Sequence, residues 1–152
     1  TKRAKDIAVQ SMILLGKAVP CLVISLAGKD FMFISSYENA IEQLLLGYAS
    51  FNFASEVGYI IAHNCSTRKD KGRPQSKKAF RKSIDRHCSL ASGVVDFVTG
   101  GVLATLGVCS WISNATGYYS GYSPSYGATN MAAALAASML NIASGGYKFS
   151  RL

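Results

Sequence analysis

Acidic residues and cysteines are scarce in this chain of 152 residues, which has eight Asp and Glu and four Cys. Four cysteines are too few for a dense disulfide framework, and a hydrophobic fraction of 49% is too high for a disordered or collagen-like chain. The sequence also lacks a Gly-x-x-x-x-Gly-Lys phosphate-binding loop and any repeat of solenoid length. The length and composition therefore indicate a single domain rich in apolar residues.

The positive charge is concentrated in one segment, residues 63–87. This segment holds nine of the 16 Lys and Arg residues and only two acidic residues, and so carries +7 of the formal net charge of +8. Outside it, long tracts hold one charge or none. A small soluble domain seldom has such tracts, because most of its surface must stay wet. The distribution of charge therefore favours a membrane protein.

Four apolar tracts are each long enough to cross a hydrocarbon core of about 30 Å as a helix. They cover residues 7–28, 40–62, 89–112 and 128–146. The sequence therefore predicts an all-α fold, a bundle of four transmembrane helices that forms a single domain over residues 1–152. A soluble four-helix bundle is the alternative. Against it, residues 131–140 show no polar stripe that could face water.

The charges that flank the tracts predict the orientation of the chain. Basic residues lie near both ends and in the predicted inner loop 63–88, whereas residues 113–127 carry no charge. Since positively charged flanks stay on the cytoplasmic side, or on the matrix or stromal side in an organelle, we expect both termini and the basic loop there. Lys17 interrupts the first tract and no A-x-A-like site follows it, which argues against a cleaved signal peptide.

Lys17, Glu56 and Asp96 are charged residues well inside the tracts. A charge at the bilayer centre costs about 2.5–3.5 kcal/mol on insertion scales unless it is paired or hydrated. Counted from the inner ends of their tracts, the three residues reach similar depths once the Lys side chain extends toward the inner surface. We expect an intramembrane ion pair of Lys17 with Asp96, and secondarily with Glu56. Such a group either fixes the helix arrangement or forms a proton or cation relay.

A basic residue in the first span and an Asp in the third span of a four-span protein resemble the MARVEL group, which includes the Casparian-strip and synaptophysin-like membrane proteins. Lys17 and Asp96 carry this resemblance. It implies a non-enzymatic organiser of a membrane domain, junction or vesicle in the plasma or vesicle membrane, without catalytic residues or a cofactor. A small accessory subunit of a large complex, alternatively in an organelle inner membrane, is a second structural interpretation. A small ion or proton conductor that uses Lys17, Glu56 and Asp96 is the alternative from a different class.

The basic segment is a candidate site for anionic lipid or for an acidic patch of a partner, although its charge could also serve only to set the topology. Nucleic acid is disfavoured as a partner because Phe80 is the only aromatic residue among these charges. The candidate binding residues are Arg68, Lys69, Lys71, Arg73, Lys77, Lys78, Arg81, Lys82 and Arg86.

Cys65 and Cys88 flank the basic segment next to the membrane and are candidates for palmitoylation. With His63 and His87 they form a zinc-capable set, but the spacing fits no familiar zinc finger, so no metal is predicted. On the outer side, Asn114 begins an Asn-x-Thr sequon and is a possible glycosylation site. The Tyr-rich residues that follow it suit an interfacial aromatic belt or a docking loop for a neighbouring protein.

The fourth tract is rich in small residues, which let another helix approach closely. We therefore expect self-association or packing of another membrane protein on this tract. The residues predicted to form this surface are Ala132, Ala133, Ala136, Ala137 and Gly145.

Overall fold

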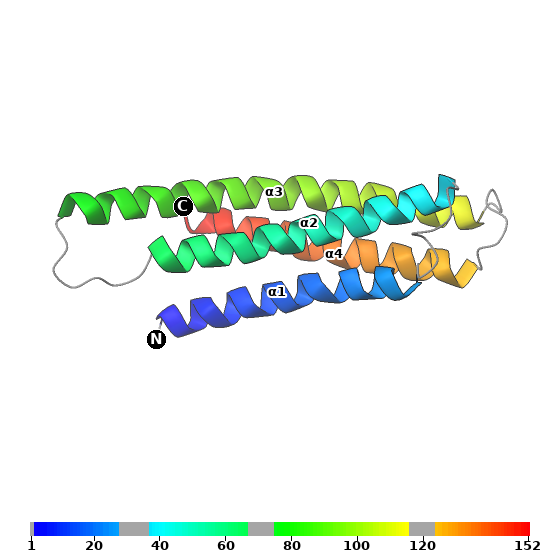
Figure 1. Ribbon diagram of the computed structural model, residues 1–152, viewed down its shortest axis with the longest axis horizontal. Coiled ribbons are helices and arrows are strands. Elements are labelled where there is room, and N and C mark those ends of the chain that lie inside the picture. Colours follow the sequence, from blue (N-terminus) through cyan, green and yellow to red (C-terminus); the bar gives the residue numbers. More distant parts are fainter. Residues whose placement is uncertain (1, 28–36, 67–74, 116–123) are drawn as a thin grey trace.

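The computed structural model describes four helices that lie side by side along one long axis (Figure 1). The described residues are 2–27, 37–66, 75–115 and 124–152. The helices are α1 (Lys2–Ala27), α2 (Tyr37–Ser66), α3 (Gln75–Ala115) and α4 (Pro124–Ser150). Within these ranges the chain contains no strand, so the predicted all-α fold is confirmed.

The helices extend beyond the predicted spans, mainly into the basic segment 63–87 from both of its ends. Helix α2 continues through Ser66 and α3 begins at Gln75, so much of the predicted inner loop 63–88 is helical. The first turns of α3 are rich in Lys and Arg, which are good helix formers. Helix α3 therefore begins well before its apolar tract, and hydropathy alone does not locate where a helix begins or ends.

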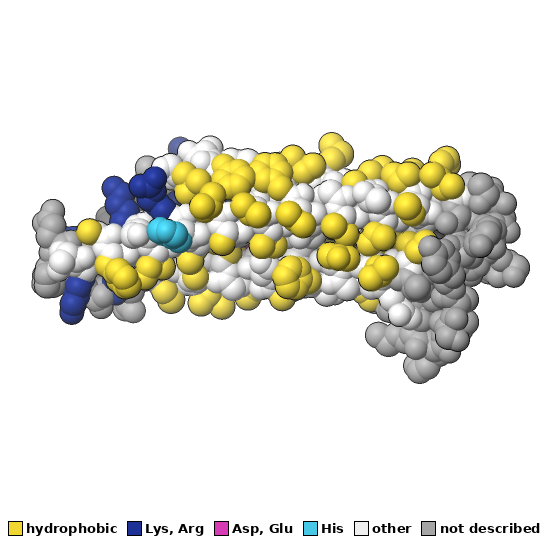
Figure 2. Space-filling view, turned by 90° about the horizontal axis from the view of Figure 1, so that it is seen from above, with side chains coloured by type: hydrophobic (Ala, Val, Ile, Leu, Met, Phe, Trp, Pro, Cys, Tyr) yellow, Lys and Arg dark blue, Asp and Glu magenta, His cyan; other side chains and the backbone are white. Residues whose placement is uncertain are grey.

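Three helices are long and apolar enough to cross a membrane. The candidate spans within the described residues are Arg3–Leu26, Gln43–Ser66 and Ser76–Ile112. Large apolar side chains point away from the bundle along these helices; Met12 is 71% exposed and Leu26 is 74% exposed. Figure 2 shows apolar side chains along the length of one face, with Lys and Arg gathered at one end. This surface suits a hydrocarbon environment better than water.

Helices α3 and α4 pack closely through small residues. Gly93, Gly100 and Gly107 follow one another at intervals of seven residues on α3. A Cβ atom at Gly107 would lie 2.6 Å from the Cβ of Ala134, so the two helices leave no room for one. The close approach also allows the Ser138 hydroxyl to donate a hydrogen bond of 2.7 Å to the Gly100 carbonyl oxygen. A seven-residue repeat of small residues is typical of closely packed helix pairs.

The small residues of α4 divide between its two faces. Ala133, Ala137 and Gly145 are buried in the bundle, whereas Ala132 and Ala136 are exposed. Ala133, Ala137 and Gly145 therefore lie against other helices of the bundle, whereas Ala132 and Ala136 are open to another chain, whose packing there stays a prediction. Since an α-helix turns by about 100° per residue, neighbouring alanines point to different faces, and composition does not show which face is inside.

The buried apolar core lies in the half of the bundle far from the two termini, which we call the distal half. Its members are Ile24, Ile41, Leu45, Leu103, Ala133, Ala134 and Ala137. The half that contains the N- and C-terminal ends is here called the terminal half (Figure 1). It holds most of the buried charged groups. The two halves thus differ in the kind of contact that joins the helices.

Candidate functional site

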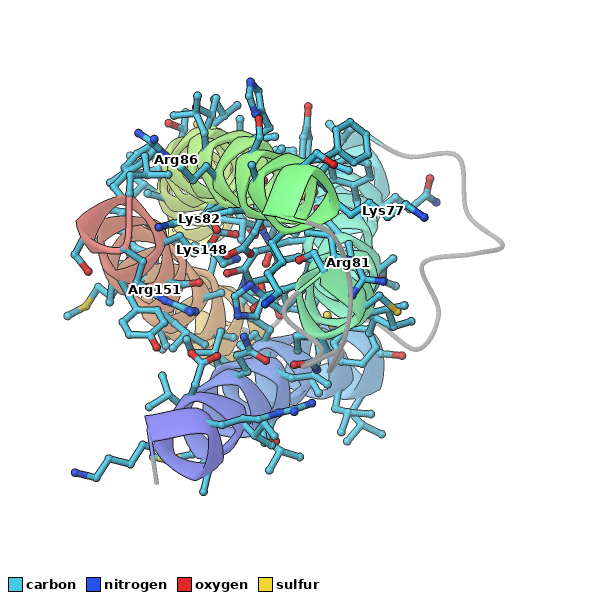
Figure 3. The ribbon with its side chains drawn as sticks, turned by 90° about the vertical axis from the view of Figure 1, so that its left-hand side faces the viewer. Lys77, Arg81, Lys82, Arg86, Lys148 and Arg151 are labelled. Carbon is cyan, nitrogen blue, oxygen red and sulfur yellow. The ribbon has the colours of Figure 1, made fainter. Side chains whose placement is uncertain are left out.

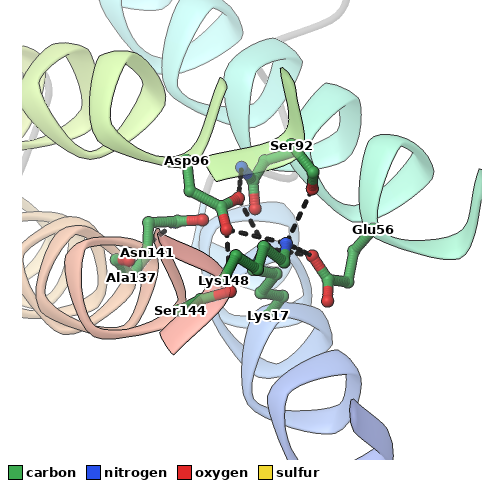
Figure 4. A network of polar contacts seen from close by, with 9 residues as sticks. Lys17, Glu56, Ser92, Asp96, Ala137, Asn141, Ser144 and Lys148 are labelled. Atoms are coloured by element: carbon green, nitrogen blue, oxygen red, sulfur yellow. Dashed lines mark hydrogen bonds and ion pairs between the residues drawn. The ribbon is translucent and has the colours of Figure 1, made fainter. Parts of the chain in front are cut away.

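Two lysines and two carboxylates meet between the four helices (Figure 4). Lys17 Nζ lies 2.7 Å from Glu56 Oε2 and 2.9 Å from Asp96 Oδ1. Lys148 Nζ lies 2.5 Å from the same Glu56 oxygen and 2.8 Å from Asp96 Oδ2. Each residue comes from a different helix. This group, here called the charge quartet, therefore joins all four helices.

The charge quartet is electrically balanced and fully buried. All four side chains are at most 2% exposed, and each formal charge contacts both charges of the opposite sign. Burying ions carries a desolvation penalty of several kcal/mol per ion, which their mutual attraction repays only in good geometry. Loss of one member would leave an uncompensated buried charge. The quartet consequently favours one arrangement of the helices over others.

Asp96 and Glu56 differ in how completely their oxygens are satisfied. Besides the two lysines, Asp96 accepts hydrogen bonds from Ser144 Oγ at 2.7 Å and from Asn52 Nδ2 at 3.3 Å. Glu56 receives both lysines on one oxygen, and its other oxygen is buried without a hydrogen-bond partner in the described part of the chain. Asp96 is therefore the better-fixed of the two carboxylates.

The structure brings together the three charged residues singled out in the sequence, Lys17, Glu56 and Asp96, and adds Lys148. Sequence reasoning placed Lys148 in the basic C-terminal flank. Two signals in the sequence could have identified Lys148 as a fourth member of this charged group. The three predicted charges leave a net charge of one negative unit, and Lys148 lies just beyond the predicted span 128–146, within reach of a long flexible side chain.

A second polar cluster surrounds His63 in the terminal half. The Nε2 atom of His63 lies 3.0 Å from Asp6 Oδ2, and its Nδ1 atom contacts Asp85 Oδ1. Asp6 also accepts hydrogen bonds of 2.8 Å from the Tyr147 hydroxyl and of 2.8 Å from the Arg151 guanidinium. These five residues are called the histidine cluster below. Sequence reasoning placed His63 at a membrane interface but did not identify its partners.

Both ring nitrogens of His63 in the histidine cluster lie against carboxylate oxygens, Nδ1 against Asp85 and Nε2 against Asp6. This arrangement suits the imidazolium form, in which both ring nitrogens donate hydrogen bonds. The Tyr147 hydroxyl donates to Asp6 Oδ1, since a carboxylate oxygen accepts hydrogen bonds. The cluster sets two carboxylates against the His63 ring and the Arg151 guanidinium, and it links α1 to the other three helices.

Tyr59 connects the two polar clusters. Its ring stacks on the His63 ring with 5.6 Å between centroids, and Lys148 Nζ lies 4.4 Å from the centre of the same Tyr59 ring. An ammonium over an aromatic face is stabilised by the ring quadrupole. Polar and aromatic side chains thus run continuously from Asp85, which is 23% exposed, to the buried charge quartet. Beyond the quartet lies the apolar core.

The other predicted residues around His63 do not gather into a metal site. Cys65 and Cys88 carry free thiols and are exposed and half-buried, respectively. His87 is exposed, with its Nδ1 atom 2.7 Å from the Ser83 carbonyl oxygen. Within the described ranges, no group of three or more His, Cys, Asp or Glu side chains is arranged to hold a metal ion.

Several predicted residues fall wholly or partly outside the described part of the chain. Arg68, Lys69, Lys71 and Arg73 are outside it. The remaining basic candidates lie on the first turns of α3, where Lys77, Lys78, Lys82 and Arg86 are exposed and Arg81 is half-buried. Asn114 lies in the last turn of α3, but its side chain is not described.

Comparison with protein-family models, with curated proteins and with solved structures finds no match to this chain. The resemblance to the MARVEL group rests on Lys17, Asp96 and the pattern of apolar tracts alone. Arguments about function therefore depend on the two polar clusters, the apolar exterior and the basic end of the bundle.

Proposed function

We propose that the chain is a non-enzymatic structural protein of a membrane. In this proposal it is a four-span bundle that organises a membrane domain, junction or vesicle, or that serves as an accessory subunit of a larger membrane complex. The observation that carries the proposal is the charge quartet, which takes one charged residue from each helix and buries all four. A balanced ion group of this kind favours a single helix arrangement, which suits a protein that presents a fixed surface to its neighbours.

The distribution of side chains on α4 supports a fourth span. Asn, Ser and Gly residues lower its hydropathy, but Asn130, Ser138, Asn141 and Ser144 are at most 4% exposed and face the bundle. The exposed side chains include Met139 and Ile142. Polar side chains turned toward neighbouring helices are typical of membrane bundles, because hydrocarbon offers them no partner.

The charges at the terminal half support an orientation with both termini on the inner side. Figure 3 looks onto this end and shows Lys77, Arg81, Lys82 and Arg86 on α3, with Arg151 near the end of α4. Cationic segments next to spans are retained on the cytoplasmic side, or on the equivalent side in an organelle. A single cysteine placed at Ser123 should then react with an impermeant reagent only from the outer side. Reaction only from the inner side would overturn this orientation.

A small proton or cation conductor remains the second candidate function. The row of polar and aromatic side chains from Asp85 through His63 and Tyr59 to the charge quartet favours it. Two observations oppose a path through the whole bundle. The lysines and carboxylates of the quartet neutralise one another, and the apolar core, with Leu45 and Leu103 both 0% exposed, lies beyond it.

Flux measurements on purified full-length chain in sealed vesicles distinguish the two functions. The structural proposal expects proton and cation flux equal to that of protein-free vesicles, both for the native chain and for Asp96→Asn. A flux carried by the native chain and abolished by Asp96→Asn would reject the structural proposal in favour of the conductor. Lys77→Gln serves as the control substitution because Lys77 is exposed on α3.

A further inference from the structure

An open groove of 580 Å³ lies at the terminal half of the bundle. Its lining includes Lys82, Ser83, Arg86, His87 and Leu90 on α3, together with Leu152. Figure 3 shows Lys82 and Arg86 on the side of α3 that faces the end of α4, whereas Lys77 and Arg81 lie on its other side. The groove therefore has its own pair of cations, separate from the rest of the basic segment.

The two cations of the groove differ from three other cations of the bundle, which each have a carboxylate partner. Lys17 and Lys148 are paired with carboxylates, as is Arg151 with Asp6. Lys82 and Arg86 are exposed, and neither has an ion-pair partner among the described residues. No acidic side chain lines the groove. Its positive charge is thus available to an anion from outside the chain, and Ser83 and His87 add further hydrogen-bonding groups.

The groove is graded from polar to apolar along α3. Leu90 lies four residues beyond Arg86 toward Asp96, or about 6 Å further along the helix axis. The predicted inner boundary of this span is residue 89, so Arg86 lies just outside the apolar tract and Leu90 just inside it. A phospholipid has the matching order of groups, with an anionic headgroup above a glycerol backbone and acyl chains.

We propose that this groove binds one anionic phospholipid of the inner leaflet. Arg86 and Lys82 hold the phosphate oxygens, Ser83 and His87 hydrogen-bond to the headgroup, and Leu90 and Leu152 contact the glycerol and the first methylene groups. The site rests on the membrane placement proposed above and adds a specific ligand class to it. Charge complementarity and the polar-to-apolar order favour a lipid over a free anion, because a free anion has no apolar part that would contact Leu90.

The experiment uses the full-length chain in phosphatidylcholine nanodiscs that contain a small fraction of a phosphatidylinositol phosphate. Native mass spectrometry then measures the apparent Kd for the first bound anionic lipid. Lys82→Gln with Arg86→Gln removes the groove cations. Lys77→Gln with Arg81→Gln removes the same charge from the other side of the same helix and is the matched control. Ser83→Leu keeps every charge and fills part of the groove.

The expected result is a loss of affinity of about tenfold or more for the groove pair, given about 1 kcal/mol per basic residue near an anionic group. The control pair should change the affinity by less than about threefold, since diffuse attraction is weak in a zwitterionic bilayer. Ser83→Leu should also weaken binding. Equal losses in both pairs would overturn the site in favour of general electrostatic attraction.

Four further outcomes separate the alternatives. Displacement of the lipid by millimolar inorganic phosphate would identify a free-anion site and overturn the lipid proposal. The absence of any preference for the anionic lipid over phosphatidylcholine would also overturn it, and would leave an acidic protein segment as the partner to test. Failure of the chain to remain in the nanodisc would instead contradict the membrane placement itself. Retention in the disc with equal binding by all variants would contradict only the groove.

Discussion

The terminal and distal halves of the bundle are held together by different interactions. In the terminal half, the charge quartet and the histidine cluster connect the helices through ions and hydrogen bonds. In the distal half, Leu45 and Leu103 pack in an apolar core beside closely approaching small residues. The difference is one of specificity, because an ion needs a particular partner whereas an apolar side chain needs a suitable volume.

A membrane would enlarge this difference. Lipid chains are about as apolar as leucine, so burying Leu103 against its neighbours gains packing but little hydrophobic free energy there. Exposure of Lys17 or Asp96 to hydrocarbon, by contrast, carries a penalty of several kcal/mol. The terminal half should thus decide which helices are neighbours, and the distal half should refine how closely they pack. Four sets of substitutions test this comparison.

The largest effect is expected when the charge quartet loses one member. Lys17→Met leaves two carboxylates facing one lysine and should reduce the free energy of unfolding by about 3–5 kcal/mol. The double change Lys17→Met with Asp96→Leu leaves the balanced pair Lys148–Glu56 and should be much milder than the sum of the two single changes. Unfolding in detergent or bicelles measures this double-mutant cycle. Additive effects would show that the quartet does not couple the helices.

The histidine cluster should give the next largest effect. His63→Leu removes the imidazole between Asp6 and Asp85 and should destabilise the bundle by about 1.5–3 kcal/mol, the range for hydrogen bonds to charged groups. Nitrogen NMR of the native chain should detect a proton on both ring nitrogens. His87→Leu is the matched control because His87 is exposed. A neutral His63 ring in the native spectrum would contradict the assigned donors.

Two glycines on α3 offer a paired test of the close helix contact. Gly107→Ala places a Cβ 2.6 Å from the Cβ of Ala134 and should destabilise the bundle by about 1–3 kcal/mol through overpacking. Gly101→Ala meets nothing within 4 Å and should be neutral or stabilising by up to about 1 kcal/mol, because alanine favours the helix. Thermal unfolding of both variants measures the difference. Equal effects would mean that α3 and α4 pack less closely than described.

The smallest effect is expected for a conservative change in the apolar core. Leu103→Met preserves the volume of a fully buried side chain and should change the free energy of unfolding by less than about 1.5 kcal/mol. Glu56→Gln is nearly isosteric but removes a charge from the quartet, and it should be clearly more destabilising. The same unfolding assay measures both. A larger loss for Leu103→Met would reverse the assigned roles of the two halves.

The sequence by itself determined the all-helical character of the chain and three apolar helices long enough to span a membrane. It also singled out Lys17, Glu56 and Asp96 as residues that need partners. Each of these conclusions depends on a local quantity: the length of an apolar tract, or the penalty for one charge at a given depth. Such quantities can be read along the chain without knowledge of which helices are neighbours.

Only the tertiary structure decided which side chains meet. It placed Lys148 in the charge quartet, paired His63 with Asp6 and Asp85, and turned Ala133 inward while Ala132 points outward. These outcomes depend on how far each helix is rotated about its axis and on which neighbour it faces. Hydropathy averaged along a tract carries no information about that rotation, and contacts between residues as distant as Asp6 and Arg151 form only when the four helices pack together.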